Sequence, residues 1–305
     1  TRKGPMAPAF ISSEIYRATG YRGNHPLAIA RVGPVMSLCE MLGWFTEDAP
    51  YLQSPQASLG TITRFHKADY VAALREAEVA GRVSPEARET YNIGTMENPV
   101  FQGLYQRAST SLGGSILAAE AALERGVAFH PAGGTHHETP DRANGFCFFN
   151  DPVFSILTLL DHGKTRVLYI DLDAHHGDGV FYAFEEDPDV AFVDLHEDGR
   201  YLYPGTGAAD ETGRGAAVGT KYNAPLPPGA DDAAFDAAWG PALELLEAQR
   251  PEFILLQCGA DSLAGDPLTH LAFTPAVHRR AAHDLVRLAE RLGHGRVLAL
   301  GGGGY

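Results

Sequence analysis

The sequence predicts an α/β protein in which helices cover both faces of one central parallel sheet. Short apolar runs alternate along the chain with amphipathic stretches, which is typical of repeated strand–helix units. Most of these runs carry branched apolar residues at consecutive positions, as expected for strands that are buried on both faces. Neither an internal repeat nor an interdomain linker is visible, so we expect a single domain over residues 1–305.

The individual elements follow from the same patterns. The apolar runs predict five strands, at residues 126–131, 166–171, 190–195, 253–258 and 296–301. Helical periodicity, first-turn prolines and terminal glycines predict four helices, at residues 68–81, 108–126, 151–163 and 274–293. The stretch 201–232 is rich in Gly, Pro and Asp, so we expect a long loop there. Loops of that length are usually either functional or disordered.

Composition limits the classes of partner. The 305 residues include 45% hydrophobic and 20% charged ones, which is ordinary for a globular enzyme. The net charge of −14 disfavours nucleic acid and acidic membranes as partners. Three widely spaced cysteines, Cys39, Cys147 and Cys258, fit a reducing cytoplasm better than a disulfide framework. No apolar run is long enough to span a bilayer, and "TRKGPMAPAF" lacks the apolar core of a signal peptide, so we expect a cytoplasmic protein.

Polar side chains gather where four of the predicted strands end. His136 and His137 follow the strand at 126–131, and "DLDAHHGDG" lies at the end of the strand at 166–171. Asp261 and Tyr305 follow the strands at 253–258 and 296–301 in the same way. Because the carboxyl ends of parallel strands meet at one edge of the sheet, where binding sites form, we expect an active site at this edge.

A metal site is the best interpretation of the ten residues "IDLDAHHGDG". Asp173 and His175 are two positions apart, so in extended backbone their side chains point to the same side. Asp261, from another strand end, is the best candidate for a third ligand. Three protein ligands with open positions are typical of a catalytic rather than a structural zinc site. Iron(II), cobalt and manganese also accept mixed N/O ligands, and the alternative is that Asp173 and His175 only cap a turn.

Several longer motifs resemble those of the histone deacetylase family, in particular its class I and the bacterial acetoin-utilisation deacetylases. They are "RGNHPLAIARV", "PAGGTHHETPDRANGFCFFND", "YIDLDAHHGDGV", "DLHEDGRYLYPGTG", "QCGADSLAGDPL" and "LALGGGGY". The resemblance covers nearly the whole chain. It implies the arginase/deacetylase α/β fold, with a parallel sheet of about eight strands, and hydrolysis of an N-acetyl amide.

The resemblance also implies a catalytic machinery. Asp173, His175 and Asp261 would hold zinc, and Tyr305 would polarise the amide carbonyl. This agrees with the chemistry of the residues, because a metal can lower the pKa of water to about 7 and polarise a carbonyl. A tyrosine hydroxyl that faces the metal can stabilise the oxyanion that forms. The four glycines before Tyr305 allow the backbone to approach the site closely.

A histidine pair completes that machinery. By the same resemblance the pair is His136 and His137, with Asp171 and Asp178 as carboxylate partners. Carboxylates of different strength can separate the pKa values of the two rings, so that one acts as base and the other as acid. The sequence does not assign the two roles. The remaining histidine of the motif, His176, receives no role other than a supporting one.

The substrate entrance departs from the usual family pattern. Gly145 and Phe146 would line the narrow tunnel for the acyl-lysine stem, as in other members. Glu97 stands where class I enzymes usually carry an aspartate at the rim, and Asp198 stands near the position of a second wall phenylalanine. A wider or more acidic mouth is therefore expected. The substrate is an acetylated protein or, as the alternative, a small acetylated amine such as an acetylpolyamine.

Three further expectations come from the resemblance alone. Backbone oxygens of residues 171–175 and of Leu195 would hold a structural potassium ion, and Arg31 would lie beside an internal channel for acetate. Members of the family continue for tens of residues beyond the matching tyrosine, so we expect a C-terminal segment to be missing after Tyr305.

Two competing functions remain open. Arginases share the fold and carry a "DAHxD" motif, but their second metal needs aspartates where this chain has Gly177 and Leu263. One metal and a deacetylase are therefore favoured over two metals and a guanidine hydrolase. A non-catalytic binding protein on the same fold is the alternative from another class, and the full set of metal, histidine and tyrosine residues argues against it.

Overall fold

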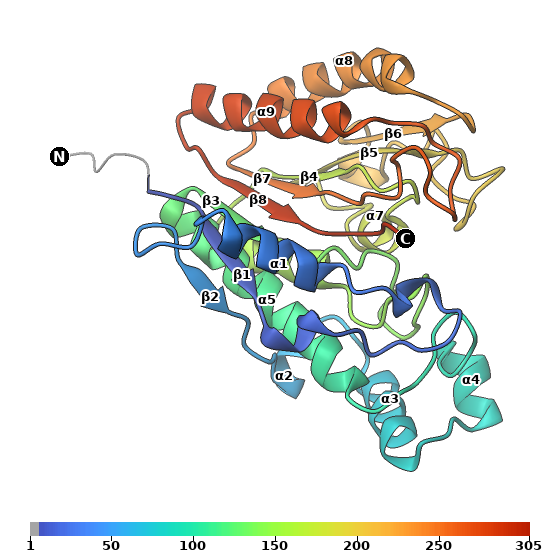
Figure 1. Ribbon diagram of the computed structural model, residues 1–305. Helices are drawn as coiled ribbons and strands as arrows, with labels where there is room; N and C mark the ends of the chain where they lie inside the picture. Colours follow the sequence, from blue (N-terminus) through green and yellow to red (C-terminus); the bar gives the residue numbers. More distant parts are fainter. Residues whose placement is uncertain (1–5) are drawn as a thin grey trace.

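The computed structural model describes residues 6–305 and contains one parallel β-sheet (Figure 1). Over these residues, its eight strands lie in the order β2-β1-β3-β8-β7-β4-β5-β6. They are β1 (Ala9–Ser12), β2 (Tyr51–Gln53), β3 (Val127–His130), β4 (Val167–Asp171), β5 (Val190–Glu197), β6 (Lys221–Leu226), β7 (Phe253–Gln257) and β8 (Val297–Leu300). All neighbouring strands are parallel, which confirms the predicted sheet type.

Helices cover both faces of this sheet, as predicted. On one face lie α8 (Asp232–Gln249) and α9 (Pro275–Arg291), and on the other lies α5 (Leu104–Arg125), as Figure 1 shows. Two more helices, α6 (Asp151–Asp161) and α7 (Asp178–Ala183), pack on the α5 face. The other α-helices of the described residues are α1 (Val32–Met41), α2 (Leu59–Ile62), α3 (Ala68–Ala80) and α4 (Pro85–Tyr91).

Strand β4 explains why the buried strands read as unbroken apolar runs. Its alternate residues enter different cores: Leu168 and Ile170 pack with α8 and α9, whereas Val167 and Tyr169 pack with α5 and α6. All five residues of β4 are buried, so no position of the strand faces solvent, where a polar side chain would be favoured. The first charged side chain, Asp171, comes where the strand reaches the edge of the sheet.

The five predicted strands and four predicted helices are present, with small changes in their bounds. The helix expected from 108 begins at Leu104. Strands β1 and β2 were not predicted, because four and three residues are too few to reveal a period. The expectation of a continuous loop over 201–232 was wrong, because residues 221–226 form β6. This strand contains Pro225, which is tolerated because β6 lies at the edge of the sheet.

Over residues 6–305, no helix is both long enough and apolar enough to cross a membrane. Residues 1–5, the first half of the N-terminal stretch that we expected to lack a signal peptide, lie outside the described part of the chain.

Candidate active site

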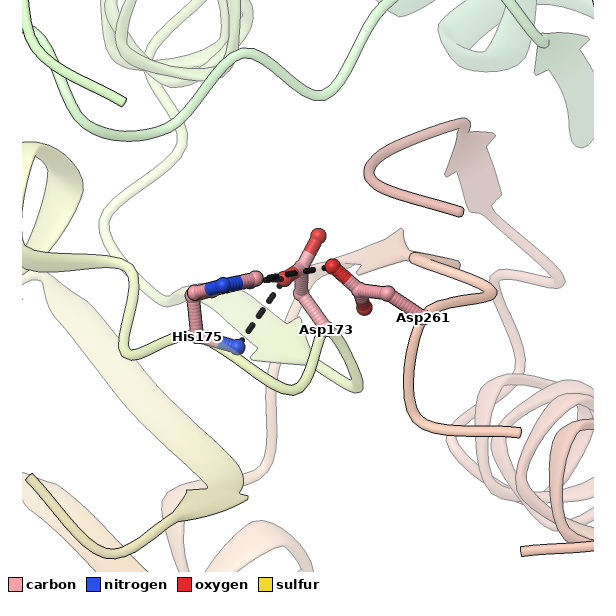
Figure 2. A group of neighbouring side chains, drawn as sticks. All are labelled: Asp173, His175 and Asp261. Carbon is pink, nitrogen blue, oxygen red and sulfur yellow. Dashed lines mark hydrogen bonds and ion pairs between the residues drawn. The ribbon is translucent and has the colours of Figure 1, made fainter. Parts of the chain in front are cut away.

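Three side chains converge at the carboxyl edge of the sheet (Figure 2). Asp173 and His175 lie on the loop after β4, and Asp261 lies on the loop after β7. The Nδ1 atom of His175 is 3.0 Å from Asp173 Oδ1 and 3.0 Å from Asp261 Oδ2. One ligand atom from each residue falls within 4.8 Å of the others, so the group can hold a metal ion.

The charges of this group also fit a cation. Burial lowers the pKa of His175, but its hydrogen bonds to Asp173 and Asp261 outweigh this effect and raise the pKa to about 10. Burial and the neighbouring Asp173 raise the pKa of Asp261 to about 7. Two enclosed carboxylates thus need a positive charge between them, and a proton on His175 provides one. A divalent metal ion can take the place of that proton, because metal ligands must be deprotonated.

The glycine-rich stretch after β8 forms one wall of the metal group. The N–H of Gly303 donates a hydrogen bond to Asp173 Oδ2 at 2.8 Å. A Cβ atom at this position would lie 2.1 Å from Asp261 Oδ2, so only glycine fits here. Arg31 fixes the stretch from outside, since its Nη1 atom donates to the carbonyl oxygens of Gly302 and Gly304 at 2.9 Å each.

Replacing Gly303 with alanine is expected to weaken the binding of a metal ion by about 10- to 100-fold, the usual effect of disturbing the partners of metal ligands. The added methyl group would displace the Asp261 carboxylate. The zinc dissociation constant, measured by competition with a chromogenic chelator, tests this. Gly240→Ala in α8 is the matched control, because a Cβ atom there meets nothing within 4 Å. Equal zinc affinity of the two variants would contradict the proposed ligand geometry.

Two adjacent histidines lie beside the metal group, and each is paired with its own carboxylate. His136 Nδ1 is 2.7 Å from Asp171 Oδ2, and His137 Nδ1 is 2.6 Å from Asp178 Oδ1. The two imidazole centroids are 4.1 Å apart. On its other side His136 Nε2 lies 3.8 Å from Asp173 Oδ2. The structure therefore brings the predicted pair and the predicted metal ligands into one site.

The two histidines differ in their ionisation. Burial lowers the pKa of His136, but the charges of Asp171 and Asp173 raise it well above its ordinary value. For His137, burial and the positive charge of His136 outweigh Asp178 and lower the pKa. The site thus favours a protonated His136 beside a neutral His137. The sequence indicated that the pKa values of the two rings could differ, but it did not show which of them is higher.

A cavity lined by Phe146, His137, Asp173, His175 and Tyr305 leads to the metal group. The rings of Phe146 and Tyr305 meet edge to face, with centroids 5.8 Å apart. The ring of Tyr203 packs edge to face on the ring of His137, with centroids 5.2 Å apart. Gly145, the other residue predicted for the tunnel wall, lines the same cavity.

The two carboxylates predicted at the substrate entrance, Glu97 at the rim and Asp198 near the tunnel wall, have other partners in the structure. Glu97 accepts a hydrogen bond from the Gly145 N–H at 2.5 Å, and Asn98 accepts one from the Phe146 N–H at 3.0 Å. They support the backbone of the wall, where Phe146 has a φ of 67° that is rare for a non-glycine residue. Asp198 forms an ion pair with Arg200. A direct contact of Glu97 or Asp198 with substrate stays a prediction.

Comparison with known proteins identifies the family of this site. A family model described as a histone deacetylase domain matches residues 25–305. The chain belongs to the histone deacetylase family. It is 38% identical to the acetoin utilization protein AcuC of Bacillus subtilis, covering 97% of this chain and 77% of that protein. It is 36% identical to histone deacetylase RPD3 of Saccharomyces cerevisiae, covering 93% of this chain and 65% of that protein.

Solved structures agree with this assignment. A crystal structure of an HDAC homolog from Aquifex aeolicus has a TM-score of 0.90 at 37% identity, covering 98% of this chain and 79% of that one. An HDAC homolog complexed with SAHA matches with the same TM-score at 36% identity and the same coverage. The predicted arginase/deacetylase-like fold is confirmed, and the chain is a deacetylase of the hydrolase class.

The position of Gly177 in this deacetylase opposes the binuclear site of arginases. A Cβ atom at Gly177 would lie 2.5 Å from Asp171 Oδ2 and 3.2 Å from His136 Nδ1. An aspartate there would disrupt the histidine–carboxylate pair. Leu263, at the second position that arginases need, packs against the apolar core instead. The residues of this chain fit one metal ion.

Several residues of the deacetylase site were not singled out from the sequence. Gln257 donates through Nε2 to Asp173 Oδ2 at 3.0 Å, and Tyr169 donates through its hydroxyl to Asp171 Oδ2 at 2.7 Å. Both lie in apolar strands, where a polar side chain is the signal that could have identified them. Tyr203 had no such signal, because it lies in a loop. His176 bonds Thr206 Oγ1 at 2.8 Å and has a buried ring, so it supports the loop.

Proposed function

We propose that this deacetylase hydrolyses the acetyl amide of acetyl-lysine in proteins, with a zinc ion held by Asp173, His175 and Asp261. The observation that carries the proposal is the juxtaposition of this group with the histidine pair at the end of the aromatic-lined cavity. Iron(II) or cobalt also suits one imidazole and two carboxylates. A small acetylated amine, such as an acetylpolyamine, is the alternative substrate.

The histidine pair supplies the proton transfers. A divalent metal lowers the pKa of water and polarises the acyl carbonyl. Asp178 accepts a hydrogen bond from the Nδ1–H of His137, which leaves Nε2 free to take a proton from the attacking water. His137 can then pass this proton to the departing amine. His136, protonated and held by Asp171, contributes positive charge beside the oxyanion that forms.

Tyr305 supplies a hydrogen bond to the same oxyanion. Its ring lies between Phe146 and Arg31, with the guanidinium carbon 5.7 Å from the ring centroid. Burial, together with the charges of Asp261 and Asp173, raises the pKa of Tyr305 well above its ordinary value. The hydroxyl therefore keeps its proton and can donate it in a hydrogen bond.

Replacing Tyr305 with phenylalanine is expected to lower kcat by about 10²–10³-fold, the usual loss when one oxyanion donor is removed. Zinc content should stay at that of the wild type, because no ligand is changed. Steady-state kinetics on an acetyl-lysine peptide, with zinc measured in the same samples, tests this. Unchanged kcat in the zinc-loaded variant would exclude the role proposed for Tyr305.

The cavity favours a slender aliphatic stem that ends in an acyl amide. Phe146 and Tyr305 offer aromatic surface on its walls, which suits the methylene groups of a lysine side chain. The net charge of −14 favours approach of a cationic protein or polyamine. Glu97 at the rim and Asp198 near the tunnel wall are proposed as the carboxylates that bind such partners.

A structural potassium ion and a product route belong to the same proposal. The potassium ion would bind backbone oxygens of residues 171–175 and of Leu195, and Arg31 would guide acetate from the inner part of the cavity that it lines. We also place the protein in the cytoplasm, since its free thiols Cys39, Cys147 and Cys258 suit a reducing compartment.

A substrate panel is the decisive experiment. Acetyl-lysine peptides, acetylpolyamines and longer acyl-lysine peptides are assayed with the zinc, cobalt and iron(II) forms of the protein. Acetate release from the peptides supports the proposal. Release from acetylpolyamines alone would favour the small-amine alternative. Inactivity of every metal-loaded form on every substrate would overturn the proposed substrate classes.

A further inference from the structure

A buried ammonium group lies at the edge of the sheet, apart from the catalytic residues. Lys221 is the first residue of β6 and is only 2% exposed. Its Nζ atom donates to the carbonyl oxygen of Asp187 at 2.9 Å and also to that of Val190. Within residues 6–305, no ion pair joins this nitrogen to a carboxylate. Lysine is almost never buried in this way unless its charge is compensated.

Two turns enclose the lysine. The turn 184–190, which runs from the end of α7 to the first residue of β5, provides the two carbonyl oxygens. The turn 212–220 covers the stem, since a Cβ atom at Gly213 would lie 3.1 Å from Lys221 Cγ. Gly213 has a φ of 100°, so glycine is required there for the backbone conformation as well.

The nearest carboxylates are committed to other partners. Glu185 forms an ion pair with Arg214 at 3.0 Å. Asp187 uses its side-chain Oδ1 atom to accept the N–H of Asp189 at 2.9 Å, and only its backbone oxygen contacts the lysine. The ammonium group is therefore held by backbone carbonyl oxygens, with negative charges nearby but not in contact. Burial lowers the pKa of Lys221 to about 8, so the group remains charged at neutral pH.

Carbonyl oxygens that converge on a buried monovalent charge are the ligands that proteins use for potassium. We propose that Lys221 fills an interior monovalent-cation site, with its ammonium group in the place that a K⁺ or NH₄⁺ ion would take between the turn 184–190 and β6. The lysine supplies this cation permanently, since it is covalently attached. A chain without the lysine would have to bind the ion from solution.

The position of the site gives it a structural consequence. Val190 is the first residue of β5, and the same strand carries Asp194. The Asp194 carboxylate accepts the Gly177 N–H at 2.8 Å and pairs with His196 Nδ1 at 2.7 Å. The cation thus fixes the start of the strand that supports the loop of His175 and Asp178. Its removal is expected to lower stability first and to affect catalysis only through this strand.

Ion-specific rescue of Lys221→Ala tests the proposal. Thermal unfolding midpoints are measured at equal ionic strength in tetramethylammonium chloride, whose cation is too large for the site, and in KCl or NH₄Cl. In tetramethylammonium, we expect the variant to unfold at least about 5 °C below the wild type. In KCl or NH₄Cl, the unfolding midpoint of the variant should recover at least half of this difference. The increase in the unfolding midpoint that the wild type itself shows in KCl or NH₄Cl is subtracted, because a potassium ion is proposed elsewhere in the protein.

Two further variants sharpen the result. Lys67→Ala removes an exposed lysine that pairs with Asp141 at 2.6 Å, and it should show no ion-specific rescue beyond the wild type. Lys221→Gln keeps donors for the two carbonyl oxygens but lacks the charge, and it should be less stable than the wild type and gain nothing from KCl. If Lys221→Ala does not fold in any salt, Lys221→Gln decides: stability equal to that of the wild type would overturn the proposal.

A second test of the proposal is to observe the bound ion directly in crystals. Crystals of Lys221→Ala soaked in a thallium(I) salt should show an anomalous peak beside the carbonyl oxygens of Asp187 and Val190, and wild-type crystals should not. Absence of this peak in the variant, or an equal response of variant and wild type to KCl, would overturn the proposal.

Discussion

Replacing Asp261 with alanine is expected to remove the metal from the site and to abolish hydrolysis. Among the described residues 6–305, three side chains form the metal group, and the variant leaves two of them. The zinc content should fall from about one ion per chain to near zero after dialysis against a chelator. Activity should fall by at least about 10³-fold, because the several kcal/mol of charge stabilisation that a metal provides are lost. Elemental analysis and acetate release, measured on the same samples, test both parts.

A matched control separates loss of metal from loss of fold. Asp236→Ala removes an exposed carboxylate of α8 that pairs with Arg280, and it should keep both zinc and activity. Circular dichroism should be equal for Asp236→Ala, Asp261→Ala and the wild type. Stoichiometric zinc in Asp261→Ala, or full activity without zinc, would exclude the proposed ligand set.

Most of the fold could be predicted from the sequence, because the central strands of the sheet are buried on both faces. In β4 the first four residues enter two cores in alternation, so the strand is a continuous apolar run with sharp ends. Strand β6 differs, because it lies at the edge and contains Asn223 and Pro225 among its six residues. An edge strand needs only one paired side, and its sequence is therefore close to that of a loop.

The site was predictable to the extent that it depends on strand ends. Parallel strands place their carboxyl ends at one edge, and this alone predicted that Asp173, His175 and Asp261 lie near one another. Tyr203 could not be found in this way, because its contact with His137 depends on the path of a long loop. The role of Glu97 could not be predicted either. Its carboxylate accepts a hydrogen bond from the N–H of Gly145, which lies 48 positions further along the chain.

Ionisation was the part of the site that only three-dimensional structure could assign. Asp171 is fully buried and also accepts the Tyr169 hydroxyl, whereas the side chain of Asp178 is 16% exposed. The two carboxylates look alike in the sequence. Their surroundings, together with the charge of Asp173, favour a protonated His136 and a neutral His137.

Replacing His137 with alanine is expected to lower kcat by about 10²–10⁴-fold, the usual contribution of a positioned general base. The neutral ring of His137 can accept a proton at neutral pH, whereas the protonated ring of His136 cannot. His136→Ala should therefore cost less activity than His137→Ala. Both variants should keep their zinc, because neither residue belongs to the metal group. Single-turnover rates on an acetyl-lysine peptide, with zinc quantified in each sample, measure the difference.

The pH dependence of kcat/KM tests the same assignment independently. Activity needs His137 neutral, so it should fall as the pH drops through the pKa of this residue. Burial and the charge of His136 place that pKa below the ordinary value of about 6.5, so the acid limb of the wild type should lie below pH 6.5. His136→Ala removes the positive neighbour, and its acid limb should move to higher pH. An unmoved limb in His136→Ala, with a loss of activity equal to that of His137→Ala, would show that the two histidines do not divide the roles as proposed.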